Sequence, residues 1–319
     1  MKKCKIRVAH DDGQRAPVNG GHMNDSIYWH TTPGKKYDIT RLMPDFETQE
    51  GAEDAWRNCI ECLENGKKSH RKLAKKLKKC CYEAPCMCPA CPKCMRDYRL
   101  WYSGQGLQLL TLHDKDDRLN PKCLKFVTIV PIDRERELNE LLDPSCPPSL
   151  FLKRMKDQLR NQLIRAGLGH LIIFGGIEAD FDVETQKWEP HFHLIVIGLD
   201  TESREWWLFM QNNGYAKNAK WGDTPVRVDQ VNDWPRQVSY CLKTAFLRKE
   251  SWLDKDTNKK KKRKVPLKPS QQRIALSFLA GLKIEERLFL FNIRRNGCEL
   301  EISQSVTNSV KLPEMEPDL

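Results

Sequence analysis

The chain has 319 residues, enough to bury a sizeable core, and Lys plus Arg exceed Asp plus Glu by 54 to 43. This positive charge favours a polyanionic partner, most simply nucleic acid. No apolar run approaches the ~20 residues of a membrane span, and the N-terminus lacks the apolar stretch of a signal peptide. We therefore expect an intracellular protein with no membrane partner, cytoplasmic in a bacterium or nuclear in a eukaryotic host.

The first third of the chain is polar and then strongly basic. Residues 1–50 show no sustained periodicity and predict loops with short elements, whereas residues 54–79 have a helical pattern that ends in a lysine-rich run. A solvated helix face and a phosphate-facing surface explain this run about equally well. The lysines assigned to DNA contact here are Lys75, Lys76, Lys78 and Lys79.

A dense cysteine cluster follows the basic run. In an intracellular protein, clustered cysteines are poor disulfide candidates and better metal ligands, and thiolates favour tetrahedral zinc. The expected zinc ligands are Cys81, Cys86, Cys91 and Cys94. Cys88 could replace Cys81, and Cys59 with Cys62 could supply one or both remaining ligands. Free thiols are the alternative interpretation.

The pattern becomes regular from Leu124 onward. Apolar, β-branched runs predict strands, and an apolar stripe at helical spacing predicts a helix. In chain order the expected elements are a strand at 124–130, a helix at 147–166, strands at 170–181 and 190–198, a helix at 201–213, a strand at 225–231 and a helix at 233–248. This order predicts an α+β fold with an antiparallel sheet and helices packed on one face.

The C-terminal part carries a second basic run. Residues 259–264 resemble a nuclear import signal and equally suit a phosphate-binding linker, in which Lys260, Lys261 and Arg263 would contact DNA. A helix-like tract at 270–295 and a polar, disordered tail follow. We therefore divide the chain into a zinc-binding region at 1–100, a catalytic domain at 101–252, and a linker, helix and tail at 253–319.

A pair of histidines stands at the head of the strand at 190–198. Alternate strand residues share a face, so His191 and His193 project together. Glu178 lies across the expected hairpin and is the expected third ligand, with Asp180 as its substitute. Mixed imidazole and carboxylate ligation suits Mg²⁺ or Mn²⁺ with open positions for phosphate oxygens.

A tyrosine and a lysine one helical turn apart follow the histidines. Tyr240 and Lys243 would share a face of the expected helix at 233–248. Phenols ionise with a pKa of ~10 and attack a phosphodiester only when the phosphorus is activated and the phenolate is stabilised. A cation can polarise the phosphate, and Lys243 can stabilise the negative charge. The pattern predicts a covalent phosphotyrosine and hence a reversible strand transfer.

The sequence His191-Phe192-His193 followed by Tyr240-x-x-Lys243 resembles the HUH endonuclease superfamily in its single-tyrosine branch, and residues 126–131 resemble the first motif of that family. The resemblance covers about residues 120–250. It implies a five-stranded antiparallel sheet of the ferredoxin or RRM type. It also implies that the chain cuts one DNA strand, stays attached to the 5′ end and leaves a free 3′ hydroxyl.

The role implied by this resemblance is initiation of rolling-circle replication of a plasmid or phage. A single-strand transposase shares the same residues and is the first alternative; a non-catalytic, zinc-dependent DNA-binding regulator is the second. The cysteine spacing is similar to zinc modules that precede the nuclease in some plasmid initiators, and the zinc region could read duplex origin DNA. The chain lacks a Walker-type loop, so we expect a host helicase and polymerase as partners, with single-stranded and duplex origin DNA.

Overall fold

The computed structural model describes residues 42–43, 46–81, 83–115, 121–131, 135–137, 140–216, 225–253 and 260–303. The loops expected at 1–41 and the tail expected from 304 onward lie outside these residues. No helix within the described ranges is long and apolar enough to cross a membrane.

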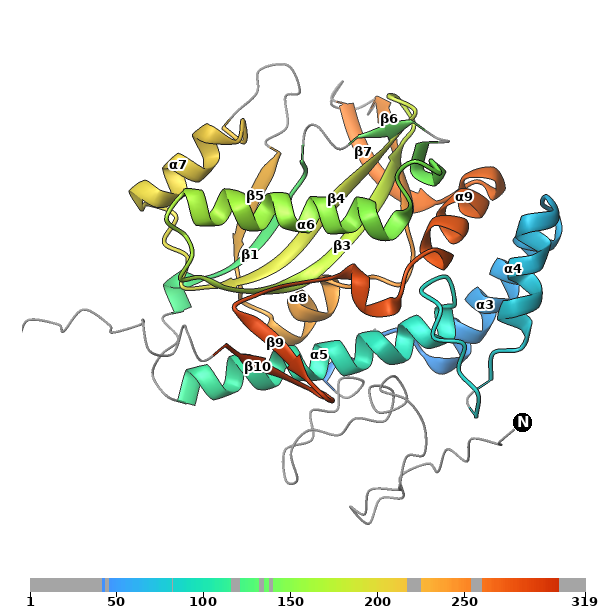
Figure 1. Ribbon diagram of the computed structural model, residues 1–319, viewed down its shortest axis with the longest axis horizontal. Helices are drawn as coiled ribbons and strands as arrows, with labels where there is room; N and C mark the ends of the chain where they lie inside the picture. The colour runs from blue at the N-terminus through green and yellow to red at the C-terminus, as the bar shows by residue number, and fades with distance from the viewer. Residues whose placement is uncertain are drawn as a thin grey trace, which may run out of the picture.

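One eight-stranded sheet dominates the described residues, and its main path runs β5-β1-β4-β3-β6-β7 (Figure 1). These strands are β1 (Leu124–Ile129), β3 (Ile172–Asp182), β4 (Lys187–Ile197), β5 (Val226–Gln230), β6 (Leu247–Leu253) and β7 (Lys260–Pro266). Two short strands leave this path: β2 (Arg136–Glu137) pairs with β4, and β8 (Leu288–Phe291) pairs with β3. The α+β class is confirmed. The sheet is mixed rather than antiparallel, however, because β6 pairs with β3 in parallel.

Helices cover both faces of this sheet, not one face as expected. The helix α6 (Pro148–Arg165) buries Phe151, Met155 and other apolar residues against one face. The opposite face is covered by α5 (Pro92–Lys115) and α8 (Trp234–Tyr240). Two-sided burial explains why every residue of β3 is buried and why β3 is apolar over most of its length.

Among the described residues, three helices precede the sheet. They are α3 (Gln49–Glu64), α4 (Lys68–Lys78) and α5. The Thr48 side chain caps α3 by accepting a hydrogen bond of 3.0 Å from the Gly51 N–H. Because α5 runs unbroken from Pro92 to Lys115, the domain boundary expected at residue 100 falls inside a helix.

The C-terminal part differs most from expectation. The basic run expected as a linker forms β7, which pairs along its whole length with β6. The tract expected as one helix at 270–295 is α9 (Pro269–Ala280), a 3-10 turn (Ile284–Arg287), β8 and β9 (Ile293–Asn296), and β9 pairs with β10 (Glu299–Ile302). The apolar run Leu288–Phe291 extends along β3, so this tract belongs to the main sheet.

The connecting elements are short. They are α7 (Arg204–Asn212) and 3-10 turns at Pro121–Cys123 and Glu140–Leu142. The helix α7 begins at Ser203, whose side chain accepts a hydrogen bond from the Trp206 N–H, and it lies beside α6.

Candidate active site and metal centres

The expected metal ligands lie together on one face of the β3–β4 hairpin. The strand register places Glu178 opposite His191, and directly opposed side chains project to the same face. The Nε2 atoms of His191 and His193 are 3.1 Å apart. The Glu178 Oε2 atom lies 3.8 Å from the first and 3.6 Å from the second. One ligand atom from each residue therefore falls within 4.8 Å of the others, a spacing that one cation can bridge.

The hydrogen bonds of the two rings leave on each Nε2 atom the lone pair that a metal would bind. His191 Nδ1 lies 2.9 Å from the Glu189 carbonyl oxygen, which only accepts, so Nδ1 carries the proton and Nε2 offers a lone pair. His193 Nδ1 lies 3.0 Å from Thr128 Oγ1, which can accept in the same way. Burial lowers the pKa of both histidines, which favours the neutral, ligating form.

Asp180, the substitute ligand, is held by another partner. Its Oδ2 atom is 3.9 Å from His191 Nε2 but only 2.6 Å from the Nζ atom of Lys264 on β7. Burial alone would raise the pKa of Asp180, yet the surrounding positive charge, including the Lys264 ammonium, outweighs burial and lowers it. Glu178 therefore completes the ligand group, with a charged Asp180 beside it.

Tyr240 and Lys243 come together, although not on one helix as expected. The helix α8 ends at Tyr240, and Lys243 lies in the turn that follows. The Lys243 N–H donates to Glu178 Oε1 at 2.8 Å instead of continuing the helix. The Lys243 ammonium lies 3.1 Å from Glu178 Oε2 and 3.6 Å from the centre of the Tyr240 ring. A tertiary contact thus ends the helix and still joins the two side chains.

A glycine in β3 lets this turn approach the sheet. Gly176 pairs with His193, and a Cβ atom at this position would stand 2.2 Å from the Cys241 carbonyl oxygen. No other residue fits without moving the backbone that follows Tyr240.

The Tyr240 ring packs against the histidine pair and stays accessible. Its centre is 4.9 Å from that of His193 and 5.8 Å from that of Phe126 on β1. Tyr240 is 38% exposed, whereas the three ligands are buried. Phe126 also stacks on His193 at 5.8 Å. Phe126 and Thr128 were assigned from the sequence to the first motif but given no role, although the alternation within 124–130 was enough to place them on one face.

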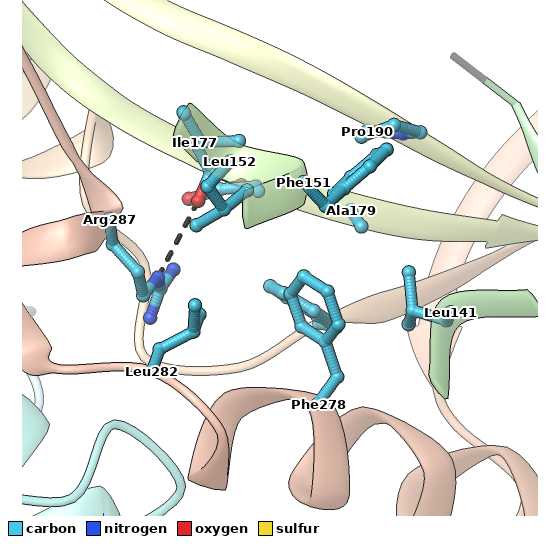
Figure 2. A pocket seen from close by; sticks show the side chains of 11 residues that line it. Leu141, Phe151, Leu152, Ile177, Ala179, Pro190, Phe278, Leu282 and Arg287 are labelled. Atoms are coloured by element: carbon cyan, nitrogen blue, oxygen red, sulfur yellow. Dashed lines mark hydrogen bonds between the residues drawn. The ribbon is translucent and has the colours of Figure 1, made fainter. Parts of the chain in front are cut away.

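Arg287 is a further residue that sequence reasoning missed. It is 1% exposed and lies behind Glu178, in the 3-10 turn before β8. Figure 2 shows its guanidinium pointing toward β3, where Nε donates to the Ile177 carbonyl at 3.5 Å. Its Nη2 donates to the Lys243 carbonyl at 2.8 Å, and burial lowers its pKa to about 10. The adjoining cavity has about 10 Å³, room for no more than one water.

Four cysteine sulfurs form a second cluster, but one of them is not the expected residue. The cluster consists of Cys80, Cys86, Cys91 and Cys94. Cys81 is exposed and outside it, because Cys80 closes the last turn of α4 through its N–H to the Leu77 carbonyl.

The alternative ligands that the spacing allowed also lie elsewhere. Cys88 is buried outside the cluster. Cys59 and Cys62 on α3 contact α9: the Gln272 side chain donates to Cys59 Sγ, and Cys62 Sγ donates to the Pro269 carbonyl. The cluster of four is therefore complete without them.

The sulfur spacing fits tetrahedral zinc. Sulfurs bound to tetrahedral zinc at about 2.3 Å stand about 3.8 Å apart. Cys80 Sγ lies 3.5 Å from Cys94 Sγ and 3.6 Å from Cys91 Sγ, and Cys86 Sγ lies 3.8 Å from Cys94 Sγ. The residues present therefore fit a structural zinc ion.

The expected DNA-contacting cations lie at two places. Lys75, Lys76, Lys78 and Lys79 are exposed on and just after α4. Arg263 is exposed on β7, 3.1 Å from Glu250 and 5.6 Å from the ring of Trp252. The side chains of Lys260 and Lys261 lie outside the described residues. Comparison with protein-family models, with curated proteins and with solved structures finds no match for this chain.

Proposed function

We propose that the chain is a metal-dependent DNA endonuclease and strand transferase, a single-tyrosine member of the HUH superfamily, in which Tyr240 attacks a backbone phosphate of single-stranded DNA. One observation supports this most: an exposed tyrosine ring packs against a buried His–His–Glu group and beneath a lysine ammonium. A packed core tyrosine would need neither the nearby ligands nor the exposure.

The proposed chemistry is a transfer between two oxygens. The Tyr240 hydroxyl gives up its proton as its oxygen bonds to the phosphorus, the bond from phosphorus to the 3′ oxygen breaks, and that oxygen takes up a proton and leaves as a hydroxyl, so that protons balance. The product is a 5′-phosphotyrosine, and attack by a 3′ hydroxyl in the reverse direction rejoins the strand. A divalent cation held by His191, His193 and Glu178 would supply the charge that polarises the phosphate.

Lys243 supports this step by its charge. Burial alone would lower the pKa of Lys243, but Glu178 and Tyr240 raise it further than burial lowers it, so the amine stays protonated. An ammonium 3.6 Å from the ring centre can stabilise a phenolate or the negative charge on the phosphate. Mg²⁺ or Mn²⁺ matches the mixed nitrogen and oxygen ligands, and zinc matches the four thiolates.

The cellular role that we propose is initiation of rolling-circle replication, with origin DNA, a host helicase and a host polymerase as partners. The exposed lysines of α4 and the basic strand β7 are the proposed phosphate contacts. A transposase would use the same site, so the two roles separate by DNA substrate: an origin or a pair of transposon ends.

The test is capture of the covalent adduct. Single-stranded origin DNA labelled at its 3′ end is incubated with the full chain and Mn²⁺, and the label is followed on a denaturing gel. Tyr240→Phe should remove the labelled protein band. Tyr215→Phe is the control, because the Tyr215 hydroxyl donates to the Gln162 side chain on α6, the helix that covers the opposite face of the sheet. An adduct that persists in Tyr240→Phe reassigns the nucleophile; no adduct with the unaltered chain favours the DNA-binding regulator.

A further inference from the structure

We infer that the cysteine cluster positions the catalytic side chains through α5, with Arg99 and Arg287 as the connecting residues. The inference rests on the proposed function for its consequence, although the coupling itself can be measured without any cleavage. It gives the cysteine-bound metal a role in the chemical step, separate from DNA reading.

The first connection joins the start of α5 to the end of α8. Two of the four cysteines flank the first turn of α5, whose Met95 N–H donates to the Cys91 carbonyl at 2.9 Å. Little more than one turn after Cys94, the Arg99 Nε atom donates to the Ser239 carbonyl at 3.0 Å. Ser239 is fully buried and directly precedes Tyr240. A displacement of this part of α5 therefore reaches the residue that carries the nucleophile.

Close packing farther along α5 makes this connection stiff. A Cβ atom at Gly106 would stand 2.6 Å from a methyl carbon of Val238 on α8 and 2.8 Å from the ring of Phe174 on β3. A glycine at this position lets the helix touch both elements. Because α5 has no free space against α8, the two helices must shift together.

The second connection reaches Lys243. Arg287 places Nη1 3.9 Å from the Met95 sulfur and donates from Nη2 to the Lys243 carbonyl at 2.8 Å. Met95 directly follows Cys94. The same short stretch of α5 is thus connected to Ser239, the residue before Tyr240, through Arg99, and to Lys243 through Arg287.

The metal determines the order of this stretch. The segment from Cys80 to Cys91 forms no helix or strand among its described residues, and it carries three of the four clustered cysteines, with Cys94 just beyond it. Binding free energy at such sites is folding free energy. Loss of the metal should therefore release the first turn of α5 and, with it, both arginine connections.

Hydrogen exchange measures this coupling directly. Amide exchange of the full chain is followed by mass spectrometry before and after a chelator removes zinc, in the absence of DNA. We expect faster exchange at 83–100 and also at 238–246, with α6 unchanged as the internal reference. Faster exchange confined to 83–100 would overturn the coupling, whether or not the chain cuts DNA.

Arginine variants test its effect on the chemistry. With saturating DNA and Mn²⁺, Arg99→Gln should slow single-turnover adduct formation by roughly 10- to 100-fold, the usual cost of a small misplacement of reacting groups. Zinc content and DNA affinity should stay unchanged, and Arg99→Lys should restore part of the rate. Arg287→Gln should act similarly; because its site is buried, it is interpreted only if its melting temperature is retained.

A matched variant on the same helix is the control. Arg96 donates to the Glu47 carbonyl at 2.8 Å and pairs with Asp97, so these contacts join it to the segment before α3 and to its own helix rather than to α8. Arg96→Gln should leave the adduct rate near that of the unaltered chain. Equal rates for Arg96→Gln and Arg99→Gln, slow or fast, would overturn the positioning role.

Discussion

The cysteine cluster and the histidine cluster differ in both their ligands and their supports. Four thiols of one kind surround the first, a complete set for tetrahedral zinc. The second has three ligands of two kinds and lies beside the exposed Tyr240. A complete ligand set leaves no position for a substrate oxygen, whereas an incomplete set leaves at least one. This difference supports the proposal of a structural site and a reactive site within one chain.

The backbone that carries the ligands also differs between the two clusters. The histidine ligands stand on paired strands, whose backbone hydrogen bonds fix Glu178 opposite His191 without any ion. Three of the cysteines stand in or beside an irregular segment. Removal of the metal at the cysteines should therefore unfold their surroundings and loosen the end of α8, while the paired strands that carry the histidines stay nearly unchanged.

The largest effect is expected at the cysteines. Cys91→Ser should remove zinc and lower the free energy of unfolding by several kcal/mol, because structural zinc contributes directly to folding. The check is zinc content by elemental analysis together with denaturant unfolding. Cys81→Ser is the matched control, since this exposed neighbour of Cys80 should keep full zinc and full stability. Equal zinc loss in both variants would contradict the assignment of Cys80.

A large effect on chemistry with a small effect on folding is expected at the histidines. His193→Gln should lower adduct formation by more than about 10³-fold, through loss of metal-dependent charge stabilisation, while changing the melting temperature little. Mn²⁺ binding by calorimetry and thermal unfolding are the measurements, with the exposed His170→Gln as control. Loss of zinc or of folding in His193→Gln would make the histidine structural and remove the contrast between the clusters.

Substitution of the two carboxylates should weaken Mn²⁺ binding by factors that differ moderately. Glu178→Gln keeps the shape of the side chain but removes its charge, and should weaken Mn²⁺ binding by roughly 10- to 100-fold. Asp180→Asn should weaken Mn²⁺ binding only a few-fold, because the Asp180 carboxylate is paired with Lys264. Titration of each variant with Mn²⁺ gives both values. The reverse order would make Asp180 the third ligand.

The smallest expected effect is a pH dependence of the stability of the metal-free chain. Burial lowers the pKa of His193 well below its value in the unfolded chain. As pH falls below about 6.5, only the unfolded chain takes up this proton, so stability is fully present above that pH and is lost below it. When the pH is lowered from 7.5 to 5.5, the free energy of unfolding of the unaltered chain should fall by about 1.4 kcal/mol more than that of His193→Gln. A change of the opposite sign would mean that Glu178 keeps His193 protonated in the folded chain.

The strands and ligands of the histidine site were predictable because their positions follow local rules. Period-two alternation places His191 and His193 on one face, and the polar turn at 183–186 places Glu178 across from them. The helix α8 was predicted too long because its end is a long-range event, the hydrogen bond from Lys243 to Glu178.

The remaining errors also depend on contacts between distant parts of the chain. The strand β8 was not predicted because its apolar run also suits a helix. Its pairing with β3 makes it a strand. Arg287 carries no local pattern at all, since its partners lie far away along the chain. Cys80 and Cys81 are neighbours, and only the last turn of α4 decides which of the two faces the sulfurs.

Gly176 lies where the proposed nucleophile and the proposed metal ligands approach each other. Its missing side chain is the space that the carbonyl after Tyr240 occupies, directly across from His193. A single methyl group there would act as a spacer, holding the phenol away from the ion while both sets of ligands kept their places. The reach of the proposed nucleophile is therefore set by a residue outside the proposed ligand group, and under the proposed function a chain altered at this point should bind DNA without becoming joined to it.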